Sequence, residues 1–98
     1  MKQGIPDLTV FKLIEARLIL DGSVTSNVIY RSLGLGRQSV SKLFTKYQAE
    51  NPNSMTYMPG KRRYVATDSF RAIYLDCRAG EYLDALQVVF GTFEETTE

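Results

Sequence analysis

The side chains with the clearest binding chemistry stand at the start of a predicted helix. Arg37, Gln38, Ser41 and Lys42 follow closely after Gly36. Arginine can donate two hydrogen bonds to guanine, glutamine can pair in a similar way with adenine, and an α-helix fits the major groove of DNA. We therefore predict that these four side chains contact base edges. Each good bidentate pair of this kind contributes about 1–3 kcal/mol of discrimination.

A second group of residues is suited to the phosphate backbone, which is contacted by cations and by hydroxyl groups. Its members lie on the same predicted helix or follow the Pro59-Gly60 turn: Ser39, Thr45, Lys46, Lys61, Arg62 and Arg63. The three consecutive cations are also typical of an edge strand that is protected against strand addition. Because they come one hairpin after a helix-turn-helix pattern, we interpret them as contacts to phosphate or to the minor groove.

The charges are divided unevenly along the chain, although the formal net charge is only +1. Residues 22–67 carry seven Lys or Arg residues against Glu50 alone, a net charge of +6. Residues 76–98 carry Arg78 against six acidic residues, a net charge of −5. A basic middle and an acidic end favour a polyanionic partner for one face and a different role for the tail.

Length and composition exclude several classes of protein. A chain of 98 residues has room for one modest hydrophobic core. Histidine is absent and Cys77 is the one cysteine, which removes disulfide frameworks, Cys/His zinc sites and any triad with an imidazole. We therefore expect no metal, no cofactor and no enzymatic activity, and we interpret Cys77 as a small, partly buried hydrophobe. The interrupted apolar stretches are too short to span a bilayer and the N-terminus has no secretion signal, so we place the protein in the cytoplasm.

The spacing of apolar residues predicts four helices and one β-hairpin. Apolar stripes at helical spacing predict helices over 8–20, 26–33, 37–49 and 81–90. In the first helix, Leu8, Ile19 and Leu20 belong to the predicted buried face, and Asp7 is placed to cap it. Aromatic and β-branched residues on both sides of Pro59-Gly60 predict strands over 55–58 and 62–67.

Three helices followed by a hairpin is the element order of a winged helix-turn-helix. Thr25 is placed to cap the second helix, and Gly34 is placed to end it with a left-handed backbone. Apolar residues on both sides of that turn lock the two helices together: Ile29, Leu33, Leu35, Val40 and Leu43. Tyr30 is a departure, since this motif usually has a small residue there for close helix crossing. We predict an α+β, mainly α fold, with a winged helix-turn-helix domain in residues 1–75.

Residues 76–98 are predicted to form a helical extension with an acidic tail. One side of this helix carries a row of apolar residues: Tyr82, Leu86, Val89 and Phe93. This row can pack back on the first helix and complete the monomer core, or it can form a self-complementary contact in a homodimer; both can hold at once. A dimer would hold two recognition helices about one turn of DNA, roughly 34 Å, apart. We expect a homodimer, because a single winged helix of this size seldom binds one half-site tightly.

Several runs of the sequence carry a family resemblance: residues 33–41, 46–47 and 53–57 and, most specifically, KRRYVATDSF at 61–70. They resemble the N-terminal winged helix of bacterial regulators that carry a WYL domain and repress phage-defence operons, and residues 81–86 resemble the linker helix of those proteins more loosely. The resemblance implies that a homodimer binds inverted-repeat operator DNA, with downstream domains that sense a nucleic-acid or nucleotide signal. Here the chain stops before such a domain. Met1 and the acidic terminus favour a complete small protein, such as a phage or mobile element carries, over a fragment of a longer regulator.

Two functional hypotheses follow from these patterns. The first is a sequence-specific regulator that binds double-stranded DNA and acts as a repressor. The second is a protein-interaction module in which the winged helix is a scaffold for a docking tail or hairpin edge, since a fold does not dictate a function. Duplex binding that weakens steeply with salt discriminates the two. RNA is a less favoured partner, because Tyr57 and Tyr64 are typical of hairpin packing rather than of an exposed stacking platform.

Overall fold

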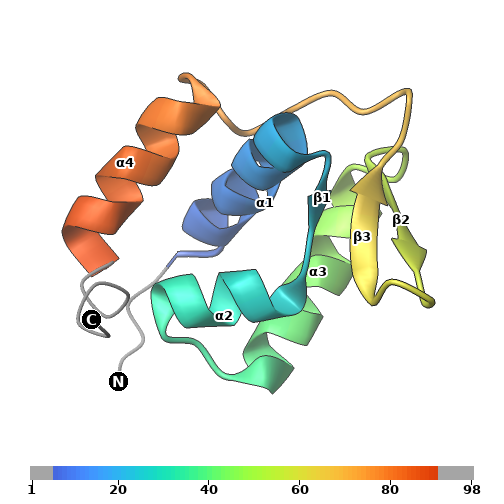
Figure 1. Cartoon of the computed structure of the whole chain (residues 1–98), viewed down its shortest axis with the longest axis horizontal. Helices are drawn as coiled ribbons and strands as arrows, with labels where there is room; N and C mark the ends of the chain where they lie inside the picture. The colour runs from blue at the N-terminus through green and yellow to red at the C-terminus, as the bar shows by residue number, and fades with distance from the viewer. Residues whose placement is uncertain (1–5, 91–98) are drawn as a thin grey trace.

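Helices and one small sheet make up the computed structural model of the chain, which describes residues 6–90 (Figure 1). The helices are α1 (Asp7–Asp21), α2 (Ser26–Leu33), α3 (Arg37–Glu50) and α4 (Ala79–Phe90). The strands are β1 (Ser23–Val24), β2 (Met55–Met58) and β3 (Arg63–Ala66), which form an antiparallel sheet in the order β1-β3-β2. This arrangement confirms the predicted winged helix-turn-helix with an additional C-terminal helix.

The core gathers apolar side chains from α1, α2, α3 and the sheet. Its buried members are Val10, Phe11, Leu13, Ile14, Leu18, Val24, Ile29, Leu33, Val40, Phe44, Tyr47 and Met55. The predicted face of α1 was too wide, since Leu8, Ile19 and Leu20 are 45%, 49% and 52% exposed. These three residues lie in the first and last turns of the helix, beyond its packed centre. The predicted cap was also wrong, because Pro6 occupies the N-cap position and Asp7 lies inside the first turn.

The turn between α2 and α3 has the predicted construction. The Thr25 hydroxyl accepts a hydrogen bond from the Val28 N–H at 3.1 Å and so caps α2. Gly34 follows α2 with φ 71°, the left-handed conformation that glycine adopts without a steric penalty. The residues preceding α2 form β1, which the sequence analysis missed because two residues show no periodicity.

An aromatic stack holds the wing, formed by β2 and β3, against α3. Tyr64 of β3 lies parallel to Phe44 of α3, with ring centroids 4.5 Å apart and an interplanar angle of 9°. Tyr57 of β2 is the register partner of Tyr64 and contacts its ring at 4.9 Å between centroids. The strands begin and end close to their predicted positions, but Arg62 lies in the turn before β3, with φ 55°.

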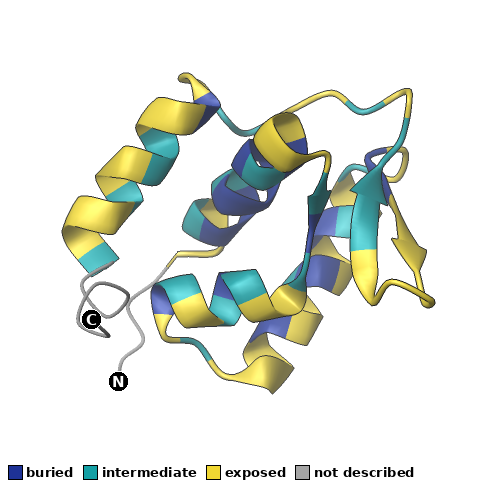
Figure 2. Ribbon diagram, viewed as in Figure 1, coloured by how far each residue is buried: buried dark blue, intermediate teal, exposed yellow. Residues whose placement is uncertain are grey.

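α4 packs along α1 on the side away from the sheet (Figure 1). Its inner side is half-buried and its outer side exposed (Figure 2). The Tyr82 hydroxyl donates a hydrogen bond to the Thr9 carbonyl of α1 at 3.0 Å. The helix begins at Ala79, two residues before the predicted start, and the preceding Cys77 is exposed rather than partly buried.

Glu15 of α1 is fully buried and organises the segment that connects β3 to α4. Its carboxylate accepts hydrogen bonds from the backbone N–H groups of Ile73, Tyr74 and Leu75 at 2.8–2.9 Å. It also accepts one from the Tyr47 hydroxyl of α3 at 2.8 Å. Four donors compensate the loss of water around this carboxylate, so that the connecting segment, α1 and α3 are held at one point.

Candidate nucleic-acid interface

The start of α3 presents the predicted base contacts to solvent. Gly36 precedes the helix in an extended conformation, and Val40, Phe44 and Tyr47 turn one side of the helix into the core. The opposite side is exposed and carries all seven candidates from this helix: Arg37, Gln38, Ser39, Ser41, Lys42, Thr45 and Lys46. Their predicted exposure is confirmed, and their contact with DNA stays a prediction.

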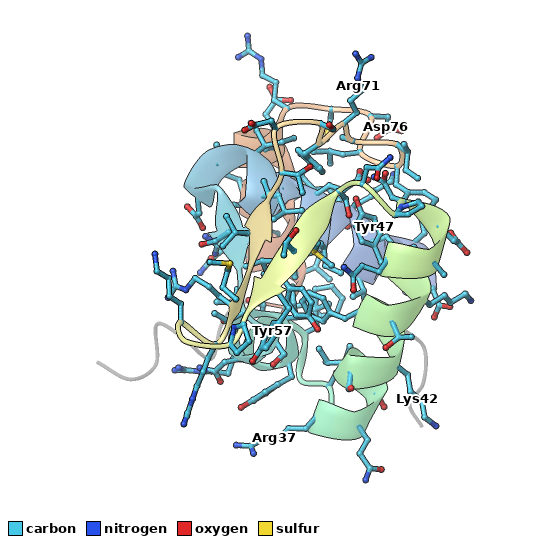
Figure 3. All side chains as sticks on the ribbon, turned by 90° about the vertical axis from the view of Figure 1, so that its right-hand side faces the viewer. Arg37, Lys42, Tyr47, Tyr57, Arg71 and Asp76 are labelled. Atoms are coloured by element: carbon cyan, nitrogen blue, oxygen red, sulfur yellow. The ribbon has the colours of Figure 1, made fainter. Side chains whose placement is uncertain are left out.

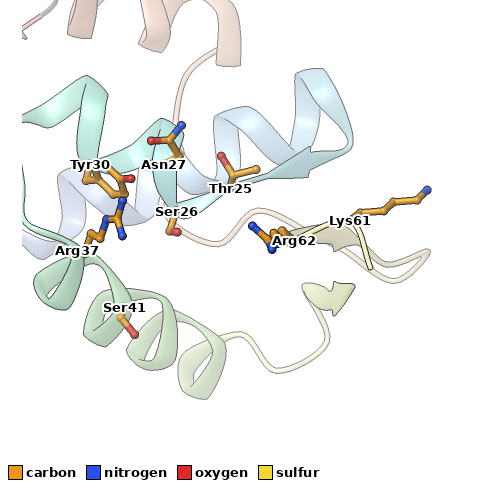
Figure 4. Close-up of a pocket in the computed structure, with 8 residues that line it drawn as sticks. All are labelled: Thr25, Ser26, Asn27, Tyr30, Arg37, Ser41, Lys61 and Arg62. Atoms are coloured by element: carbon orange, nitrogen blue, oxygen red, sulfur yellow. The ribbon is translucent and has the colours of Figure 1, made fainter. Parts of the chain in front are cut away.

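The cations of the wing are exposed as well, but they point in different directions. Arg63 lies in β3 and donates a hydrogen bond to the Ser23 hydroxyl of β1 at 3.3 Å. Lys61 and Arg62 lie in the turn, where Arg62 extends toward Ser26 and Lys61 points away from it (Figure 4). The wing therefore offers two separately directed cations at its tip and a third along the sheet.

The structure brings the wing tip and the start of α3 together around one pocket of about 600 Å³. The residues that line it come from α2 and its cap, α3 and the wing: Thr25, Ser26, Asn27, Tyr30, Arg37, Ser41, Lys61 and Arg62 (Figure 4). The sequence analysis did not predict that the four lining residues that precede α3 belong to a binding site. Three consecutive polar residues at the start of α2 were the available signal, because a helix-turn-helix sets this helix start beside the next helix.

The pocket end of α3 is electropositive within the described part of the chain. None of the ion pairs among residues 6–90 involves Arg37, Lys42, Lys61 or Arg62. Glu50, the one acidic residue in the basic middle of the sequence, lies at the other end of α3 and accepts a hydrogen bond from the Tyr74 hydroxyl. In Figure 3, Arg37 and Lys42 lie at one end of the molecule and Tyr47, near the other end of α3, lies far from them.

Two of the predicted backbone contacts on α3 have partners within the chain. The Lys46 ammonium lies 2.7 Å from the Asp7 carboxylate of α1, and this hydrogen bond raises the pKa of Lys46 above its usual value. The Thr45 hydroxyl donates to the Ser41 carbonyl one turn earlier at 3.2 Å. Asp7 is far from Lys46 in sequence, which is why the sequence analysis did not foresee the pair.

The predicted dimer residues are divided between the core and the surface. Tyr82 and Leu86 are half-buried and pack against the core of their own chain. Val89 is 68% exposed, and Phe93 lies outside the described residues. Packing back on the monomer core, the first alternative given for these four residues, therefore holds for Tyr82 and Leu86.

Within residues 6–90, no group of three or more metal-ligating side chains occurs, and none of the helices has the length and apolar composition that a membrane span requires.

One of the comparisons with known proteins identifies a family for this chain. A search among curated proteins finds no significant match. The model of one family, described as the BrxR transcriptional regulator winged helix-turn-helix domain, matches residues 8–88. Since this match covers nearly all of the described structure, the chain belongs to the family of BrxR winged helix-turn-helix transcriptional regulators.

Proposed function

We propose that this protein is a cytoplasmic, sequence-specific repressor that binds an inverted-repeat operator in double-stranded DNA as a homodimer. One observation carries the proposal: the exposed start of α3 and the basic wing tip meet on one face, around a common pocket. None of the cations at that pocket has an acidic partner within residues 6–90. DNA is a dense polyanion, so such a face gains affinity by displacing counterions from phosphates.

In this proposal α3 enters the major groove, because an α-helix fits there and its outer side chains reach base edges. The exposed side of α3 carries the four side chains that serve as base contacts: Arg37, Gln38, Ser41 and Lys42. The remaining cations and hydroxyl groups of the candidate set contact the backbone and fix the register of the helix on the duplex.

The homodimer is proposed to form through the C-terminal extension, residues 76–98. Tyr82 and Leu86 attach α4 to its own chain, whereas the exposed Val88 and Val89 offer apolar surface to a second copy. A twofold contact of this kind matches a twofold operator, with half-sites spaced by about one turn of DNA. The resemblance to WYL-domain repressors supports the same mode of binding.

Selection of binding sites from a pool of random duplexes tests the proposal. We expect a palindromic consensus, a mobility shift at low salt and a steep loss of affinity as salt rises. Gln38→Ala should relax base preference at one position of the consensus, and Lys61→Ala should weaken binding to all duplexes alike. Arg71→Ala is the matched control, since this exposed arginine lies at the opposite end of the molecule from Arg37 (Figure 3).

Failure of the wild-type chain to shift any duplex at low salt would contradict DNA binding and favour the interaction-module hypothesis. A consensus without symmetry would contradict the homodimer while leaving sequence-specific binding in place. Equal losses in Gln38→Ala and Lys61→Ala on selected and random duplexes would overturn the division between base and backbone contacts.

A further inference from the structure

The pocket between α3 and the wing has the lining of an anion site. Arg37 of α3 and Arg62 of the wing tip each contribute a guanidinium group, and both have exposed side chains. Thr25, Ser26 and Ser41 add hydroxyl groups to the lining, and no carboxylate lines it. Guanidinium and hydroxyl donors together match an oxyanion with several acceptor oxygens, which is the chemistry of a phosphate group.

Arg37 is turned toward this pocket by a contact inside the protein. Its guanidinium carbon lies 5.5 Å from the centroid of the Tyr30 ring, within the range of a cation–π interaction. Figure 4 shows the side chain reaching from α3 back toward α2, with Tyr30 above its guanidinium group. A side chain held in this direction is not extended from the outer face of α3, where base edges would lie.

Arg62 approaches the same pocket from the wing. Its φ of 55° makes it the one non-glycine residue with a positive φ in the described part of the chain. Side-chain-bearing residues adopt this conformation at a steric cost, which glycine would avoid. The resulting backbone directs the Arg62 side chain from the tip of the wing toward Ser26 (Figure 4).

We propose that this pocket holds one phosphate of the DNA backbone, clamped between Arg37 and Arg62. The inference rests on the proposed function and deepens it, because it moves Arg37 from the predicted base contacts to the backbone. The volume of about 600 Å³ is larger than a phosphate alone and admits the sugars that flank it in a continuous strand. Base discrimination by α3 then depends on Gln38 and Lys42, because Ser41 lines the pocket, while the clamp sets where α3 lies along the groove.

The clamp can be tested with duplexes in which one phosphate at a time is replaced by an uncharged group. The wild-type chain is titrated with a series of selected duplexes, each carrying a methylphosphonate at one position. We expect one position per half-site at which the substitution lowers affinity by about tenfold, the size of one charge-assisted hydrogen bond. Arg37→Ala and Arg62→Ala should each lower affinity for the unmodified duplex by a similar factor. The same methylphosphonate should cost the double variant Arg37→Ala/Arg62→Ala less than about twofold further, because both contacts to that phosphate have already been lost.

Two further measurements separate the clamp from its alternatives. A new random-duplex selection with Arg37→Ala should return the wild-type consensus, whereas a changed base at one position would overturn the clamp and make Arg37 a base contact. Inorganic phosphate or a nucleoside triphosphate, added at matched ionic strength, should not displace the duplex. Displacement beyond the ionic-strength control would identify a free phosphate ligand as the occupant and overturn the assignment to DNA.

The controls distinguish failure of the clamp from failure of DNA binding. Both arginines are exposed, so circular dichroism of the variants should match the wild type. Tyr30→Phe keeps the ring and should bind like the wild type, whereas Tyr30→Leu should lose affinity for every duplex. If no duplex binds the wild type, the proposed function fails first. If duplexes bind but no single phosphate couples to either arginine, the clamp alone is overturned.

Discussion

The charged groups near the two ends of α3 differ in whether they have partners within the chain (Figure 3). At the end near Tyr47, the buried carboxylate of Glu15 is fully paired with one hydroxyl and three backbone N–H groups. At the other end, Arg37 and Arg62 line a pocket with no acidic partner among residues 6–90. The two ends therefore have different roles. One end holds the fold together, and the other keeps cations without acidic partners, which an added polyanion can bind.

The largest effect expected from this comparison is a loss of stability in Glu15→Gln. The amide has the shape of the carboxylate, but it offers one acceptor oxygen and directs N–H groups toward other donors. We expect the free energy of unfolding, measured by urea denaturation, to fall by about 3 kcal/mol. Glu81→Gln, on the exposed side of α4, is the control and should change it by less than about 0.5 kcal/mol. Equal effects of the two substitutions would show that stability is not concentrated at the Glu15 end.

A smaller loss is expected in Tyr47→Phe at the same end. The hydroxyl donates to Glu15 at 2.8 Å and accepts from the Asn51 amide at 3.0 Å, so its removal should lower the free energy of unfolding by about 1–2 kcal/mol. Burial, followed by the hydrogen bond to Glu15, raises the pKa of Tyr47 well above its ordinary value of 10.0. The unfolded chain then releases this proton at lower pH than the folded chain, so the stability due to Tyr47 is present below about pH 10 and is lost above it.

The difference between wild type and Tyr47→Phe isolates this dependence on pH, since other tyrosines and lysines titrate in both chains. We expect the stability advantage of the wild type to shrink as pH rises above about 10. A constant difference across that range would mean that Tyr47 ionises equally easily in the folded and unfolded chains.

The sequence analysis was most accurate where the signal is local. Thr25 and Gly34 mark the ends of α2 through their own backbone and side-chain preferences, and both predictions are confirmed. The aromatic and β-branched residues on both sides of the Pro59-Gly60 turn predicted the wing for the same reason. The exposure of the seven candidates on α3 also followed from helical spacing alone.

The sequence analysis did not foresee contacts that are created by distant segments. Glu15 interrupts an apolar stripe and is nevertheless buried, because donors from Ile73, Tyr74 and Leu75 surround it after folding. The spacing of residues along α1 gives no information about those donors, which are distant in sequence. The same reason applies to Lys46, whose partner Asp7 is brought close by the packing of α1 against α3.

Replacement of Arg62 by glycine separates stability from binding at the pocket end. Glycine adopts φ 55° without strain, so Arg62→Gly should leave the free energy of unfolding unchanged or raise it by up to about 1 kcal/mol. Its affinity for duplex DNA should fall. Gly34→Ala is the matched control: it places a side chain at φ 71°, where nothing lies within 4 Å of the added carbon, and should lose about 1 kcal/mol through the backbone alone. A clear loss of stability in Arg62→Gly would show that the arginine serves the fold rather than the ligand.

The smallest effect concerns Lys46, the one candidate contact on α3 that is paired with an acid among residues 6–90. In Asp7→Asn the ammonium is released from its carboxylate partner, and a negative charge beside α3 is removed. We expect affinity for duplex DNA at low salt to rise by up to about threefold, with a salt dependence steeper by at most about 0.9, the share of one added phosphate contact. Asp21→Asn is the control, because it removes the same charge and breaks the Arg17 pair at the opposite end of α1. A lower affinity in Asp7→Asn alone would contradict this expectation. It would mean that the Asp7 carboxylate positions the Lys46 ammonium for a DNA phosphate, instead of competing with the phosphate for that ammonium.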